Sequence, residues 1–176
     1  EHPEVRGAAP YVLGPVLVET QVEEGNPRVY TPIVRGVDPK LEGNVSRIPE
    51  SIIDGEFELR GRSLLIGESL AHFLKVGVGD RLAIYAPKAF HEWQQARKEG
   101  RNEEAPLASD FTITGVFDVG YAEYNHQFVL TSLGNAQDLY GLEDHVHGLI
   151  VMLRDPEQAY RVGNELRTLL GGEVEI

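Results

Sequence analysis

The chain has 176 residues, of which 41% are hydrophobic and 25% charged, the balance of an ordinary folded domain. Its formal net charge of −12 argues against a nucleic-acid partner, because a surface that binds phosphates needs clustered lysine and arginine side chains. The absence of cysteine excludes disulfides and thiolate metal sites, and no apolar run approaches the length of about 18 residues that a membrane-spanning helix needs.

Residues 1–10 are expected to be the end of a helix that begins upstream. The chain starts abruptly and without a signal peptide, as a domain excised from a longer protein would. Gly7 and Pro10 favour the end of a helix there. The β-rich runs at residues 11–22 and 28–37 are separated by a turn-favouring Glu-Gly-Asn-Pro stretch, so together they predict a hairpin.

The middle of the chain is predicted to combine short strands with one helix. Leu70, Phe73 and Leu74 have the spacing of one helical face, so the apolar period changes there from that of a strand to that of a helix. The expected elements are, in order, an irregular stretch at 40–51 with a turn near Ile48-Pro49, a turn at Asp54-Gly55, strands at 57–59 and 63–66, a helix at 68–74, and strands at 81–87, 111–119 and 124–131.

The C-terminal part is predicted to be helix, strand, helix and strand. Ser132 is a suitable N-cap for a helix that ends at Gly141, and an alternating apolar run predicts a strand at 146–153. Asp155-Pro156 opens the last helix, and residues 173–176 are expected to form a final strand. The side chains expected in the core of that helix are Tyr160, Val162, Leu166, Leu169 and Leu170. This mixture of helices and hairpin-connected strands indicates an α+β fold.

The sequence predicts no catalytic residue, metal site or cofactor. No phosphate-binding loop, dinucleotide fingerprint or His-Glu-x-x-His motif is present, and Gly77 and Gly79 are interpreted as a bend into a strand. His145 and His147 share one face of an expected strand, but a zinc ion needs three or four ligands and no partner cluster is evident. We therefore interpret both as solvated surface histidines.

The main functional candidate is the segment at residues 88–109. Connections in compact domains are usually about 4–6 residues long, and much longer ones are commonly functional or disordered. The segment carries four basic and four acidic residues, so it is neutral within an acidic chain. Phe90, Trp93 and Arg97 have helical spacing, which predicts a short helix over residues 89–99.

Two interpretations of this helix remain open. Its aromatic stripe either packs against the rest of the domain or belongs to a protruding arm that holds a partner. Tryptophan, tyrosine and arginine are enriched where proteins bind one another. On the second interpretation, the candidate partner-binding residues are Phe90, Trp93, Arg97, Lys98 and Arg101.

Several phrases, in the right order between about Val34 and Pro156, resemble the extracytoplasmic domain of lipoprotein-releasing ABC permeases of the LolC/LolE type, within the wider group of MacB-like permeases. Each phrase alone is of low specificity, and the ordered set is fairly specific. The phrases are Leu65-Ile-Gly-Glu-Ser-Leu-Ala71, Val76-Gly-Val-Gly-Asp80, Phe111-Thr-Ile-Thr-Gly-Val-Phe117, Val119-Gly-Tyr-Ala-Glu-Tyr-Asn125, Leu133-Gly-Asn-Ala-Gln137 and Gly148-Leu-Ile-Val-Met-Leu-Arg-Asp-Pro156.

The resemblance implies a MacB-like periplasmic core domain at the periplasmic face of the bacterial inner membrane, between the first two transmembrane helices of a permease. It implies a porter-like α/β subdomain (residues 1–36 and 126–176) and an inserted β-rich, sabre-like subdomain (residues 37–125). Residues 88–109 take the position of the family's hook loop, which holds a lipoprotein carrier. That hook would be an extended, proline-containing hairpin, whereas residues 89–99 are expected to be helical.

The resemblance also implies a function without bond chemistry. The domain would couple ATP-driven motion of the transmembrane helices to extraction of a lipoprotein or lipid-like substrate. The partners would be a cytoplasmic ATPase subunit, a second permease subunit, and a periplasmic carrier or adaptor protein. Two alternatives stand beside it: a MacB-like efflux or peptide-export permease domain that docks an adaptor, and a free-standing enzyme or ligand-binding domain with a β-barrel core.

Overall fold

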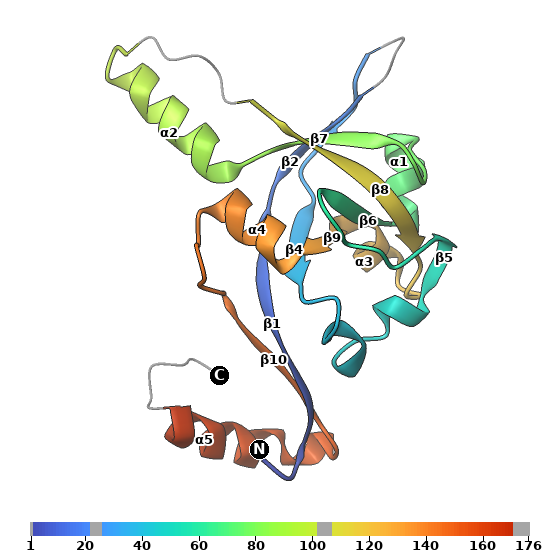
Figure 1. The fold of residues 1–176 in the computed structure, drawn as a ribbon, viewed down its shortest axis with the longest axis vertical. Coiled ribbons are helices and arrows are strands. Elements are labelled where there is room, and N and C mark those ends of the chain that lie inside the picture. The colour runs from blue at the N-terminus through green and yellow to red at the C-terminus, as the bar shows by residue number, and fades with distance from the viewer. Residues whose placement is uncertain (1, 22–25, 102–106, 171–176) are drawn as a thin grey trace.

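The computed structural model describes residues 2–21, 26–101 and 107–170 (Figure 1). The strands are β1 (Val5–Pro15), β2 (Leu17–Thr20), β3 (Val29–Tyr30), β4 (Ile33–Val37), β5 (Ile52–Gly55), β6 (Ser63–Gly67), β7 (Arg81–Tyr85), β8 (Ser109–Phe117), β9 (Phe128–Ser132) and β10 (Gly148–Leu153). The helices are α1 (Glu68–Leu74), α2 (Pro87–Lys98), α3 (Ala122–Gln127), α4 (Leu133–Tyr140) and α5 (Ala159–Leu170), with short 3-10 turns η1 (Glu42–Asn44), η2 (Ile48–Glu50) and η3 (Pro156–Gln158).

A single sheet organises the fold, in the order β10-β1-β4-β9-β6-β8-β7-β2-β3, and β5 pairs with β8 outside this path. Most neighbours are antiparallel, whereas β4 pairs with β9 and β6 with β8 in parallel. Only Val16 separates β1 from β2, so one continuous run of chain pairs with β4 near one end of the sheet and with β7 near the other. The sheet therefore curls round upon itself.

The core lies on both faces of β6. Leu64, Leu65 and Ile66 are fully buried, because the strand has neighbours on either side and successive side chains point to opposite faces. Leu64 and Ile66 pack with Leu70 of α1 in the larger hydrophobic cluster, and Leu65 packs with Phe117 in the smaller one.

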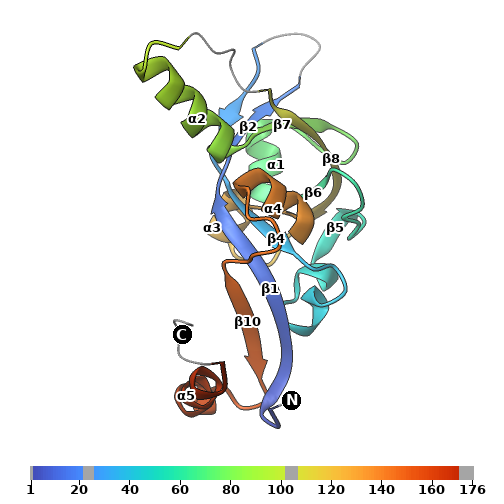
Figure 2. The same cartoon turned by 60° about the vertical axis from the view of Figure 1, so that its left-hand side comes forward.

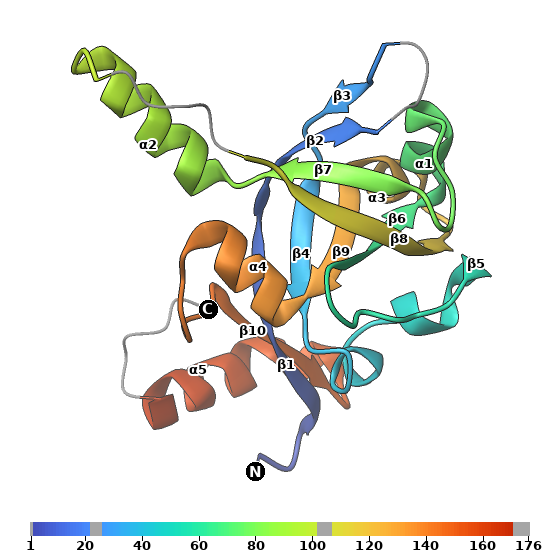
Figure 3. The ribbon, with the colours of Figure 1, turned by 45° about the horizontal axis from the view of Figure 1, so that its top comes forward.

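Two regions project from this body at opposite ends (Figure 2). One is α2, which leaves β7 and extends away from the sheet, as Figure 3 also shows. The other is the ribbon formed by β1 and β10, which carries α5 and the first residues of the chain at its tip. The first described residues and α5 thus lie at the same end of the molecule.

Much of the order expected from the sequence is confirmed. The predicted hairpin is formed by β1 and β2 with β4 and β3, and the helix predicted at residues 68–74 is α1. The hydroxyl of Ser132 accepts a hydrogen bond from the backbone N–H of Asn135 (3.3 Å), and Gly141 ends α4 with φ 63°. The final strand expected at residues 173–176 lies outside the described residues.

The helix end expected at residues 1–10 is wrong, because β1 begins at Val5 and pairs with β10 from the opposite end of the chain. The backbone groups of β1 form hydrogen bonds with β10, and the sequence near residue 10 contains no sign of this distant strand. A side chain at Gly7 would collide with the backbone of Asn44, so the small residue serves this close approach rather than a helix end.

Other predictions in the middle of the chain are wrong in whole or in part, although residues 128–131 of the strand predicted at 124–131 are confirmed as part of β9. Asp54-Gly55 ends strand β5 instead of making a turn, and residues 57–59 are irregular, although Leu59 is buried and fills the smaller core cluster. Residues 124–127 belong to α3 rather than to a strand. There the side chain of Asn125 donates to Asp118 (2.5 Å) and accepts from the N–H of Val119 (3.1 Å), which folds the chain back.

The side chains expected in the core of the last helix are only partly buried. Val162 is fully buried, whereas Tyr160 and Leu169 are 86% and 74% exposed. The helix therefore rests on the ribbon through a narrow contact. The side chain of Leu170 lies outside the described residues.

Candidate functional site

Helix α2 occupies the long connection between β7 and β8, which the sequence singled out. Pro87 is its first residue, where a missing N–H costs nothing, and Gly100 with φ 77° follows its end. The helix predicted at residues 89–99 is therefore confirmed. The return segment at residues 102–106 lies outside the described residues.

The base of α2 packs against α4. The side chain of Lys88 passes over Gly141, where any added Cβ atom would lie 2.8 Å from the lysine Cδ and Nζ atoms. This places the ammonium group at the C-terminal end of α4, the negative end of that helix. Beside it, the Tyr140 hydroxyl donates to the Pro15 carbonyl (2.7 Å), and burial raises the pKa of Tyr140 to about 12.

Trp93 and Arg97 form the central feature of α2. They are one helical turn apart, and the guanidinium carbon of Arg97 lies 5.0 Å from the centroid of the Trp93 ring, a cation–π arrangement. Trp93 is half-buried and Arg97 is exposed, while Ala96 between them is fully buried. At the described positions, α2 therefore buries some side chains and presents others to solvent.

The remaining predicted residues lie near the end of α2. Lys98 is exposed, and Arg101 is exposed and forms an ion pair with Glu99 at 2.9 Å. The side chain of Phe90 lies outside the described residues. The structure thus brings Trp93 and Arg97 into contact and places exposed Lys98 at the end of α2 and exposed Arg101 just beyond it. An aromatic and cationic surface on an acidic domain suits recognition of another molecule.

Among the described residues, no group of three or more histidine, aspartate or glutamate side chains is arranged so that it could hold a metal ion. His145 and His147 precede β10 and bind backbone groups instead. The Nδ1 atom of His145 lies 3.1 Å from the Leu142 carbonyl oxygen, and that of His147 lies 2.9 Å from the Leu13 carbonyl oxygen.

A buried charged network near the end of β4 was missed by the sequence analysis. Arg35 forms an ion pair with Glu42 at 2.8 Å, and their side chains are only 10% and 1% exposed. Arg35 also donates to the hydroxyl of Tyr124 (3.3 Å), and Ser46 donates to Glu42 (2.5 Å). The available signal was a lone charged residue inside the apolar run that forms β4.

This network ties β4 to η1 and α3, segments that are distant in sequence. An ion pair taken out of water needs such additional hydrogen bonds, because neither partner can be solvated instead. It supplies no substrate site, because the side chains of Arg35 and Glu42 are enclosed by the fold. Its role is to fix how these segments meet.

Comparisons of sequence place the chain in a known family. The family model described as "MacB-like periplasmic core domain" matches residues 1–169. The lipoprotein-releasing system transmembrane protein LolC of Xylella fastidiosa (strain Temecula1) is 27% identical over 173 residues, which cover 97% of this chain and 38% of that protein. LolC of Neisseria meningitidis serogroup B is 28% identical over 88% of this chain and 35% of its own length. The chain thus spans little more than a third of these relatives.

Solved structures agree in fold. The extracellular domain of the ABC-type transporter YknZ from Gram-positive bacteria gives a TM-score of 0.59 at 13% identity, covering 96% of this chain and 78% of that one. The periplasmic region of MacB from Actinobacillus actinomycetemcomitans gives a TM-score of 0.58 at 11% identity, and the match covers 97% of this chain and 68% of that one. None of the helices in the described ranges is long and apolar enough to cross a membrane. The chain belongs to the MacB-like periplasmic core domain family, and it is the periplasmic domain of an inner-membrane permease of the LolC/MacB type.

Proposed function

We propose that this domain couples ATP-driven movement of an ABC permease to the extraction of a lipoprotein or a lipid-like substrate, which it hands to a soluble periplasmic partner. The domain itself performs no bond chemistry. ATP is hydrolysed by a separate cytoplasmic subunit, reached through the transmembrane part of the parent chain. A second permease subunit completes the transporter.

The observation that carries this proposal is the likeness of 97% of the chain to LolC, a protein named for lipoprotein release. The fold adds physical support. The start of β1 and helix α5 lie at one end of the molecule, and α2 projects at the other (Figure 2). A rigid body of this shape can carry a displacement from its attachment to the membrane to a contact far from it.

In this proposal α2 is the contact element. Trp93 and Arg97 anchor the partner, and Phe90, Lys98 and Arg101 are the other proposed contact residues. The half-buried ring of Trp93 under the Arg97 guanidinium is already ordered, so little side-chain freedom is lost when a partner covers it. The cationic side chains favour an acidic partner surface.

The proposed division into two subdomains places residues 1–36 and 126–176 in the porter-like part and residues 37–125 in the sabre-like part. In its favour, β10, β1, β4 and β9 are consecutive in the sheet, and so are β6, β8 and β7. The β2–β3 ribbon belongs in sequence to the first part and hydrogen-bonds to β7 of the second. It joins the two parts.

The test is capture of a purified periplasmic lipoprotein carrier by the immobilised domain. Changing Trp93→Ala together with Arg97→Ala should weaken capture about tenfold or more, because two central contacts are lost. Arg47→Ala is the matched control, since it removes one positive charge from a side chain that is 91% exposed and distant in sequence from α2. Equal capture by the double variant would exclude α2 as the contact.

An adaptor protein is the second candidate partner, because the sequence also resembles MacB-like permeases, for which the resemblance implies such a partner. The same immobilised domain distinguishes the two. Capture of a periplasmic adaptor with no capture of the carrier would replace lipoprotein release by efflux or peptide export as the function of the parent permease.

A further inference from the structure

The first residues of the chain are bound by residues that follow β10. The backbone N–H of Arg154 donates to the Glu4 carbonyl (2.9 Å), and its side-chain Nε donates to the Pro3 carbonyl (3.1 Å). His2 contacts Glu165 of α5 at 2.7 Å. Three consecutive residues at the start of the domain are thus each bound to its C-terminal part.

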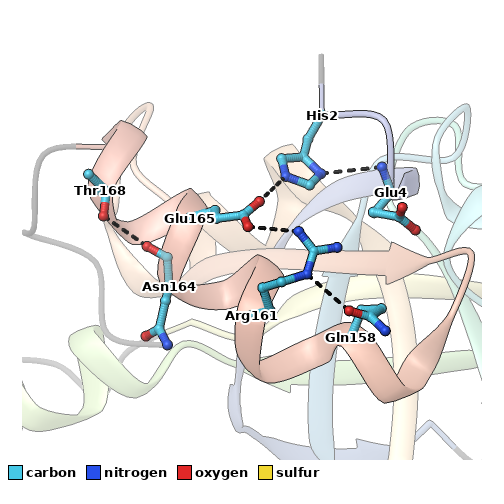
Figure 4. Close-up of polar contacts among 7 residues, drawn as sticks. All are labelled: His2, Glu4, Gln158, Arg161, Asn164, Glu165 and Thr168. Carbon is cyan, nitrogen blue, oxygen red and sulfur yellow. Dashed lines mark hydrogen bonds and ion pairs between the residues drawn. The ribbon is translucent and has the colours of Figure 1, made fainter.

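Figure 4 shows how the imidazole of His2 is oriented. Its Nδ1 atom accepts a hydrogen bond from the backbone N–H of Glu4 (3.3 Å). A backbone N–H can only donate, so in the neutral ring the proton is on Nε2, which points at the carboxylate of Glu165. The imidazole therefore donates to Glu165 without needing a positive charge. The His2 side chain is only 11% exposed.

Glu165 is held from the other side as well. Its Oε1 atom accepts from Arg161, one helical turn earlier, at 2.7 Å, and the Nε of Arg161 donates to Gln158 (3.0 Å). The carboxylate thus uses one oxygen for the N-terminal segment and the other for its own helix (Figure 4). We call the set formed by His2, Arg154, Arg161 and Glu165 the end clamp.

The ribbon beneath the clamp needs such a contact. Strand β1 pairs with β4 only from Tyr11 onward, so the part of β1 between Val5 and Pro10 has β10 as its only strand partner in the described sheet. A two-stranded ribbon is marginally stable by itself. Helix α5 adds one fully buried side chain, Val162, while Tyr160 and Leu169 are largely exposed. Hydrogen bonds and ion pairs therefore supply much of what joins the N-terminal segment to α5.

We propose that the end clamp makes the segment that enters the domain and helix α5, through which the chain leaves it, move as one unit, with Glu165 as the positioning residue. The inference rests on the proposed function, in which both segments are attached to the moving transmembrane part of the permease. Without the clamp, the two attachments would shift independently, and their displacement would separate the ribbon instead of moving the body and α2.

The test uses the full-length permease with its ATPase subunit. Hydrogen exchange measures the protection of residues 2–4 and of α5, and ATP-driven lipoprotein release is measured beside ATP hydrolysis. Glu165→Ala should raise exchange in both segments together and reduce release severalfold, with hydrolysis retained. Glu157→Ala is the matched control, because it removes the same charge from an exposed position just before α5. His2→Gln keeps an N–H donor and should restore release where His2→Ala loses it.

The outcomes separate the clamp from the proposed function. Exchange that rises in α5 alone, or release that stays unchanged when both segments lose protection, would overturn the clamp as a coupling device. A wild-type permease that hydrolyses ATP and releases no lipoprotein would overturn the proposed function, while the exchange data would still report whether the two segments are joined.

Discussion

The centre of the sheet and the two outlying helices are built by different means. In β6 every residue is buried, with strands on both sides and core on both faces. In α2 and α5, one side chain each, Ala96 and Val162, is fully buried among those that the structure describes. Regions with few buried contacts open and move at lower free-energy cost than the core. We therefore expect the sheet to supply most of the stability, while the proposed function assigns contact and movement to the outlying helices.

Charged groups follow the same division. Both side chains of the Arg35–Glu42 pair lie inside the body, whereas both side chains of Glu99–Arg101 near α2 are exposed and Glu165, the partner of His2 beside α5, is 43% exposed. Removing one partner of a buried pair leaves an unsolvated charge behind, while a surface pair gains little free energy over its hydrated partners. Substitutions should therefore lower the free energy of unfolding most in the centre of the sheet and least in the outlying helices.

The largest effect is expected for Glu42→Ala. It leaves the guanidinium of Arg35 buried without its counter-charge, so the free energy of unfolding should fall by about 3–5 kcal/mol. Urea denaturation measures this. Glu50→Ala, at a nearby side chain that is 76% exposed, should change it by less than about 0.5 kcal/mol. Equal losses in the two variants would contradict the division between centre and surface.

A smaller effect is expected in α5. Val162→Ala removes two buried carbon atoms from the one anchored position, which should cost about 1–2 kcal/mol. Leu169→Ala removes more carbon from a side chain that is 74% exposed and should cost less than about 0.5 kcal/mol. Thermal unfolding of the two variants in parallel checks the order, and the reverse order would mean that α5 is seated differently.

Tyr140→Phe should cost about 1 kcal/mol, because the hydrogen bond from its hydroxyl to the Pro15 carbonyl is lost. Ultraviolet titration gives a second check. Burial raises the pKa of Tyr140 to about 12, so its contribution to stability is complete below the ordinary value of 10.0 and disappears as the pH rises through the raised value. If the tyrosine that titrates at the highest pH in the wild type is missing from the titration of Tyr140→Phe, that signal belongs to Tyr140.

The smallest expected effect is a change in the stability contributed by Glu165 as the pH falls into the acid range. Hydrogen bonds from His2 and Arg161 lower the pKa of Glu165 below its ordinary value of 4.5. The ionised carboxylate therefore stabilises the fold above that value, and this contribution disappears as the pH falls through the lowered pKa. The difference in melting temperature between wild type and Glu165→Gln should shrink under acid relative to neutral pH. A difference that is independent of pH would exclude the carboxylate as its cause.

The sequence predicted elements whose signals are local. The helical spacing of Leu70, Phe73 and Leu74 and the capping residues Ser132 and Gly141 act within a few residues, and both helices formed as expected. Helix α2 was predicted in the same way. The site that it carries was predicted as a set of residue types, while the Trp93–Arg97 contact follows from their spacing of one turn.

What the sequence could not predict depends on partners distant in the chain. Strand β1 extends to Val5 because β10 is there to pair with it, and Glu42 is buried because Arg35 faces it. The contact of His2 with Glu165 spans nearly the whole chain. Local patterns contain no information about such contacts, so the misplaced elements and the missed charged groups have the same physical origin.

The most direct measurement of the central claim is ATP-driven lipoprotein release by the full-length permease with Trp93→Ala and Arg97→Ala in α2. If the domain works by carrying movement to a partner held at α2, ATP hydrolysis will continue while release into the carrier-containing solution falls about tenfold or more. Release at the wild-type rate would contradict the account.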